Sequence, residues 1–227
     1  MKILGLIAMT AISATTVFPG ETGPARERKV TVCMDPSADG RGIRAAQRLA
    51  SRTTGQMVTV YLQNEASVPY PMLSRARTLA AEMFAGVGVQ IDWRAGQRAE
   101  SQLLREGAIA VRLTLDTPDE FKSTVGAFAT PSEGVHITVL YQHLAWSLAK
   151  PGLAPALLAH VLVHEITHIL EGIARHSETG IMKANWTSGD YYDMQTKTLA
   201  FASEDIELIH RGLTQRHSHS EKVALEQ

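Results

Sequence analysis

The sequence predicts an α+β fold in which a small, twisted mixed sheet packs against one helix near its start and against a second, central helix. Segments rich in β-branched residues alternate along the chain with amphipathic helical segments. One helical segment, residues 156–171, is apolar nearly all round, which is typical of a helix buried at the centre of a domain. With 227 residues, 44% of them hydrophobic, the chain can bury a core as one domain or a two-lobed one.

The charge balance argues against one class of partner. The chain carries 22 basic and 23 acidic residues, and no basic stripe is interleaved with aromatic side chains. Such a stripe is the usual footprint of nucleic-acid binding. We therefore expect no nucleic-acid partner.

The N-terminus has the pattern of an export signal. Lys2 precedes an apolar run from Ile3 to Met9, and small residues at 11–14 offer a cleavage site. The alternative is an ordinary buried element. The run is too short to span a bilayer, and no other segment is apolar enough to do so. We predict a signal peptide at residues 1–14, a secreted or periplasmic protein and no stable membrane insertion.

An N-terminal extension is expected at residues 15–55. It begins with a linker rich in Pro and Gly at 19–24, followed by a strand at Lys29–Met34 and an amphipathic helix at Arg41–Arg52. Cys33, the only cysteine, lies in the strand, so no internal disulfide can form. We expect it to act as a small apolar residue.

The main domain is expected at residues 56–213. Its strands are predicted at Met57–Leu62, Val89–Trp93, Ala108–Leu115, Val125–Ala129 and Val135–Tyr141, the last two forming a hairpin. Its helices are predicted at Pro71–Ala85, Gln142–Ala149, Ala156–Glu171 and Glu204–Gly212, the last capped by Ser203. Glycines follow the first and third helices. The polar tail, residues 214–227, is expected to be disordered.

The most informative stretch is His164-Glu165-x-x-His168 on the central helix. Histidines four residues apart lie on one helix face and can bind one Zn²⁺ together. Glu165 is rotated by about 100° from His164, which leaves it beside the metal as a proton acceptor and not as a ligand. Buried histidines and a glutamate are costly unless they are paired or bound to metal, so the apolar helix favours a zinc site.

A catalytic zinc needs a third protein ligand. His176 is one candidate, because Gly172 allows the chain to turn back toward the metal. Glu171 is the competitor, since it lies three residues after His168 on the same stripe. It can instead accept a hydrogen bond from a ligand imidazole.

These residues resemble those of the metzincin zinc peptidases, most closely the matrixin-like branch. The likeness is carried by His164-Glu165-x-x-His168, Gly172, His176 and Met182, and it implies a zincin/metzincin-like fold with a Met-turn and a C-terminal helix. It implies further that His164, His168 and His176 bind zinc, that Glu165 is the general acid/base and that Met182 lies beneath the metal. The chain departs from the family pattern in one respect. Gly172 and His176 follow His168 by four and eight residues, which makes the loop two residues longer.

The resulting hypothesis is a secreted zinc endopeptidase whose peptide or protein substrate lies extended along the strand at 135–140. Two alternatives remain open: a zinc hydrolase of a non-peptide amide or ester, and a non-catalytic exported zinc-binding module. A further idea is that the Cys33 thiolate keeps the enzyme latent by occupying the open coordination position of the zinc. Trp186, Tyr191 and Tyr192 are expected either to shape the substrate pocket or to pack in the core.

Overall fold

The computed structural model describes residues 7–10, 56–117, 125–129, 135–144, 147, 150 and 152–225. The expected strand at 29–34, which contains Cys33, and the expected helix at 41–52 lie outside the described residues.

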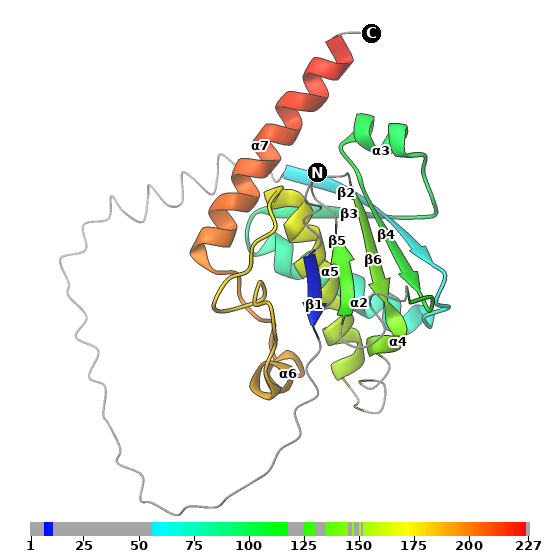
Figure 1. Ribbon diagram of the computed structural model, residues 1–227, viewed down its shortest axis with the longest axis vertical. Helices are drawn as coiled ribbons and strands as arrows, with labels where there is room; N and C mark the ends of the chain where they lie inside the picture. The colour runs from blue at the N-terminus through cyan, green and yellow to red at the C-terminus, as the bar shows by residue number, and fades with distance from the viewer. Residues whose placement is uncertain are drawn as a thin grey trace, which may run out of the picture. The chain divides into compact units, whose positions relative to one another are not determined.

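Six strands form one mixed sheet in the order β1-β5-β6-β4-β2-β3 (Figure 1). They are β1 (Ile7–Thr10), β2 (Gln56–Asn64), β3 (Val89–Ala95), β4 (Ile109–Thr114), β5 (Val125–Ala129) and β6 (His136–Leu140). Strands β2, β3, β4 and β6 run parallel to one another, whereas β5 is antiparallel to β6 and β1 is antiparallel to β5. The mixed sheet and its five predicted strands are therefore present.

Strand β1 is an edge strand of the sheet that the sequence did not predict. Ile7 pairs with Ala129 and Thr10 pairs with Val125. The segment belongs to the predicted signal peptide, whose removal stays a prediction.

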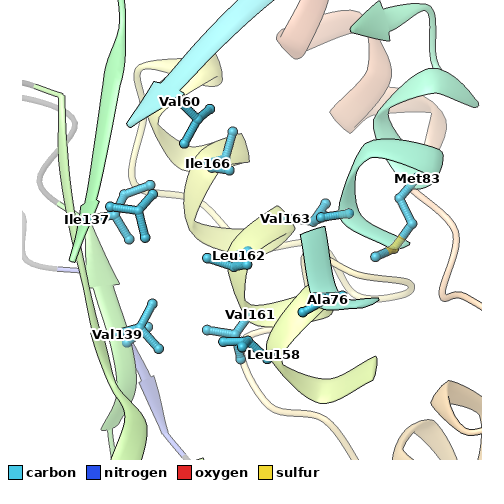
Figure 2. Close-up of a cluster of buried hydrophobic side chains, with 14 of the residues drawn as sticks. Val60, Ala76, Met83, Ile137, Val139, Leu158, Val161, Leu162, Val163 and Ile166 are labelled. Carbon is cyan, nitrogen blue, oxygen red and sulfur yellow. The ribbon is translucent and has the colours of Figure 1, made fainter. Parts of the chain in front are cut away.

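Helix α2 (Tyr70–Ala85) follows β2 and ends at Gly86, close to the predicted bounds. Pro71 lies in its first turn, where the missing N–H costs no hydrogen bond. Its buried stripe includes Ala76 and Met83, which face Val163 of the central helix (Figure 2). Packing along this stripe joins α2 to the core.

Helix α5 (Leu153–Glu171) is that central helix, and it begins two residues before Pro155. Every residue except Pro155 is buried. Val60, Ile137 and Val139 of the sheet face it, as Figure 2 shows. The expectation that no other segment is apolar enough to cross a bilayer is wrong for this helix, which passes by length and composition. However, 94% of its most apolar stretch is buried inside the protein, as in the core helix of a globular domain.

Three short helices bury only one or two side chains each. Helix α3 (Glu100–Glu106) and helix α6 (Ser188–Met194) were not predicted. Helix α4 (Tyr141–Leu144) matches the start of the predicted Gln142–Ala149, and most of the rest of that prediction lies outside the described residues. Thr187 and Asp190 form a capping box at the start of α6. That pair is a sequence signal for a helix start and could have revealed α6.

Helix α7 (Ser203–Leu225) corrects two predictions. It continues past Gly212, where an end was expected, and it occupies most of the tail that was expected to be disordered. The position of Gly212 inside the helix requires glycine, because a Cβ there would overlap the carbonyl oxygen of Leu170. Arg216 extends the contact, since its guanidinium donates to the carbonyl oxygen of Gly107 at 3.0 Å. The glycine thus permits a close approach of α7 to α5 and does not stop the helix.

Candidate metal centre

Two of the predicted metal-binding histidines lie on α5, one turn apart. The Nε2 atoms of His164 and His168 are 3.0 Å apart, and both side chains are fully buried. This is the geometry expected of two imidazoles that point at one ion, because zinc–nitrogen bonds are about 2.0–2.1 Å long.

His176 reaches the same place from the loop after α5. Gly172 ends the helix with a φ of +69°, a conformation that glycine adopts without strain. The His176 ring centroid lies 5.2 Å from that of His164 and 5.0 Å from that of His168. The three histidines each offer a ring nitrogen, and these nitrogens all lie within 4.8 Å of one another.

The three histidines are in the neutral state that metal binding requires. Burial lowers the pKa of His164 to about 4, and burial together with the neighbouring His164 and His176 lowers the pKa of His168 to about 2. Burial and the nearby Arg175 also lower the pKa of His176. The imidazoles are therefore neutral near pH 7 and keep lone pairs for a metal.

Several buried polar atoms at the centre have no hydrogen-bond partner among the described residues. They include Nε2 of His176 and both carboxylate oxygens of Glu165. Leaving such atoms unpaired costs free energy, which a bound ion and its water can recover. Three neutral imidazoles are a donor set that suits Zn²⁺, and the residues present fit it.

The tautomer of His164 is fixed from outside the helix. Its Nδ1 lies 2.9 Å from the carbonyl oxygen of Ile181. Because a carbonyl oxygen only accepts, the ring proton is on Nδ1 and the lone pair on Nε2 faces the triad. Trp186 donates its Nε1–H to the same oxygen at 3.2 Å and packs edge-on against the His164 ring. Trp186 therefore supports the centre from the core side, whereas Tyr192 is exposed.

Glu165 is fully buried, and burial raises its pKa to about 8. Its position beside His164 on α5 places a carboxyl group of raised basicity at the metal-binding end of the helix.

Met182 follows Ile181 on the loop and is fully buried. The loop is held in place by backbone hydrogen bonds from Ser177 N–H to the Met182 oxygen, at 2.8 Å, and from Ile181 N–H to the Ala200 oxygen, at 2.9 Å. Residues 181–182 form a turn, and the role of Met182 as a Met-turn residue stays a prediction.

Glu171, the competitor for the third ligand, lies elsewhere. Among the described residues, the group of converging donor atoms contains the three histidines and not Glu171. The charged groups that affect the Glu171 carboxyl are instead Asp205, Arg175 and Glu204. The geometry thus brings His176, and not Glu171, to the other two histidines.

The predicted substrate strand at 135–140 is wrong. Strand β6 lies between β5 and β4 and pairs with both, so it has no free edge for a peptide. Strand order depends on contacts far apart in the sequence and is not encoded in the hairpin itself. On that side of the sheet β1 is the edge strand, and it pairs with the outer side of β5.

Comparison with solved structures finds archaemetzincin from Methanopyrus kandleri, which is 18% identical with a TM-score of 0.48, over 71% of this chain and 98% of that one. A zinc-dependent peptidase from Methanocorpusculum labreanum is 13% identical with a TM-score of 0.45, over 66% of this chain and 99% of that one. No family model matches the chain, and neither does any curated protein sequence.

Proposed function

We propose that the protein is a zinc-dependent endopeptidase in which His164, His168 and His176 hold the metal. The observation that carries the proposal is the convergence of three neutral histidines next to a fully buried glutamate without a hydrogen-bond partner among the described residues. Three protein ligands leave one coordination position open, as in catalytic zinc sites. A structural site would be closed by a fourth protein ligand and would not need Glu165.

Glu165 is the general base in this proposal. When bound, zinc polarises the scissile carbonyl and makes water more acidic. Glu165 takes the proton of the attacking water on a carboxylate oxygen and passes it to the leaving amine. Its raised pKa supports this role, because a carboxylate in an apolar setting is a stronger base than one in water.

The other residues of the centre orient the ligands. The Ile181 carbonyl holds the proton of His164 on Nδ1, and Trp186 donates to the same oxygen. Met182 is proposed to be the Met-turn residue that packs beneath the metal.

An extended peptide is the substrate we propose, paired with the outer edge of β5. The pairing of β1 with this edge supports the idea, because it shows that β5 accepts an antiparallel strand there. If residues 1–14 are removed on export to a secreted or periplasmic location, the edge becomes free. Sequencing the N-terminus of the exported protein tests whether residues 1–14 are removed.

Glu165→Gln tests the proposed function. We expect zinc to remain bound, since the three histidines are intact, while hydrolysis of a peptide library falls by at least about 100-fold. In the wild type, a chelator should abolish cleavage and added zinc should restore it. Full activity of Glu165→Gln would disprove the peptidase mechanism, and cleavage of simple esters or amides but not of peptides would identify a different hydrolase.

A further inference from the structure

His176 differs from the other two histidines in that no helix holds it. Its neighbours in the chain, Arg175 and Ser177, both contact Asp205 near the start of α7. Arg175 Nη1 and Nη2 each lie 3.3 Å from Oδ1 of Asp205, and the Ser177 hydroxyl donates to the same oxygen. One carboxylate oxygen therefore anchors the chain on both sides of the histidine.

Asp205 is itself held firmly. Its side chain is fully buried, and Oδ2 accepts the backbone N–H of Ala202 at 2.9 Å, at the start of α7. A buried carboxylate is tolerated only when such donors satisfy it. Arg175 also pairs with Glu204 at 2.7 Å, which fixes the guanidinium from its exposed side.

The opposite side of the loop is tied to the turn at Met182. Ser177 donates its backbone N–H to the Met182 oxygen at 2.8 Å, while its hydroxyl contacts Asp205. Ser177 thus connects the loop both to this turn and to α7. The imidazole of His176 lies between these anchors, with Nε2 directed at no hydrogen-bond partner among the described residues.

We propose that Asp205, acting through Arg175 and Ser177, is a positioning residue that holds His176 ready to bind zinc. The proposal rests on the proposed function, because it takes His176 to be the third ligand. Fixing a loop residue costs backbone conformational entropy. Because these contacts order the loop during folding, that entropy is already lost before the metal binds, and zinc binding does not have to offset it.

The competing explanation is that Asp205 only caps α7 through Ala202. Ser177→Ala separates the two, because it removes one of the two loop contacts to Asp205, the Ser177 hydroxyl, and leaves the Asp205–Ala202 hydrogen bond intact. Ser177→Thr keeps a hydroxyl and serves as the conservative rescue. Asp193→Asn is the matched control, since Asp193 is a half-buried residue of α6 that pairs only with Lys197 among the ion pairs of the described residues.

The measurements are the zinc dissociation constant, by competition with a chelator, and the melting temperature of the metal-free protein. We expect Ser177→Ala and Asp205→Asn to bind zinc about 10–100-fold more weakly, the range found when partners of metal ligands are removed. Ser177→Thr and Asp193→Asn should bind as the wild type does. A purely structural role would lower the melting temperature of Asp205→Asn and leave zinc affinity unchanged for Ser177→Ala.

Zinc affinities of Ser177→Ala and Asp205→Asn within twofold of the wild type would overturn the proposal, whatever happens to the melting temperature. If Asp205→Asn does not fold, Ser177→Ala decides alone. The proposed function fails in a different way, namely if the wild type binds no zinc or if His176→Ala binds it as well as the wild type.

Discussion

The metal centre combines two regions that are held in different ways. His164 and His168 are placed by α5, in which every residue except Pro155 is buried and the backbone spacing alone brings the two rings together. His176 is placed by a loop whose anchors, Asp205 and Ala200, come from a later part of the chain.

Different parts of the sequence therefore determine the positions of the two kinds of ligand. For the helix pair, that part is five consecutive residues, from 164 to 168. For the loop ligand, it consists of side chains about thirty residues downstream, chiefly Asp205. A longer loop than that of the metzincin pattern is therefore compatible with a complete triad, provided that tertiary contacts fix it.

The largest expected effect tests which loop residue completes the site. His176→Ala should weaken zinc binding by more than about 100-fold, which is the upper limit for residues that only support a ligand. Glu171→Gln should leave the affinity unchanged, because Glu171 lies outside the histidine group. Chelator competition on both variants measures this, and the reverse order of effects would make Glu171 the third ligand.

A pair of glycines tests how rigid the loop is. Gly180 and Gly172 both have positive φ, +76° and +69°, but a Cβ at Gly180 would overlap the Ala200 carbonyl whereas one at Gly172 would meet nothing within 4 Å. We expect Gly180→Ala to lower the free energy of unfolding by about 2–4 kcal/mol and Gly172→Ala by about 1 kcal/mol. Urea denaturation of the metal-free proteins measures both. Equal losses would show that backbone strain matters and the close approach does not.

The smallest expected effect concerns the charge of Glu171. Burial first, and then Asp205, raises the pKa of this carboxyl to about 8. Between the unfolded pKa of about 4.3 and this value the folded state binds the extra proton, so wild-type stability falls as pH rises through that window.

The glutamine side chain of Glu171→Gln cannot ionise, so this variant should not lose stability as the pH rises. The variant should therefore gain about 1–2 kcal/mol on the wild type at pH 8 and nothing at pH 4 to 5, a gain reduced by water that reaches the partly open site. Urea denaturation of the metal-free proteins at the two pH values measures the gain, with Glu207→Gln on the exposed side of α7 as the control. A gain of equal size at both pH values would contradict the assignment.

Much of the fold could be predicted from local patterns. Alternating β-branched residues located β2, and the buried stripe and flanking glycine located α2. The HExxH motif located two members of the triad because its geometry is local. The short helix α6 was missed because too few of its side chains face the core, although its capping pair marks it.

What could not be predicted depends on contacts between distant segments. Gly212 has the character of a helix end, and only the approach of Leu170 explains its place inside α7. The order of the strands, which removes the free edge from β6, follows from the whole sheet. Asp205 is an ordinary first-turn carboxylate in the sequence, and nothing there shows that Arg175 and Ser177 meet it.

The anchoring of the loop to α7 has a consequence for the order in which the site matures during synthesis. A nascent chain that ends before residue 203 contains all three histidines and the whole of α5 but lacks Asp205. Such a chain offers two organised imidazoles and a third on an untethered loop. If Asp205 positions His176 as proposed, tight metal binding requires that the C-terminal helix has been synthesised and has docked.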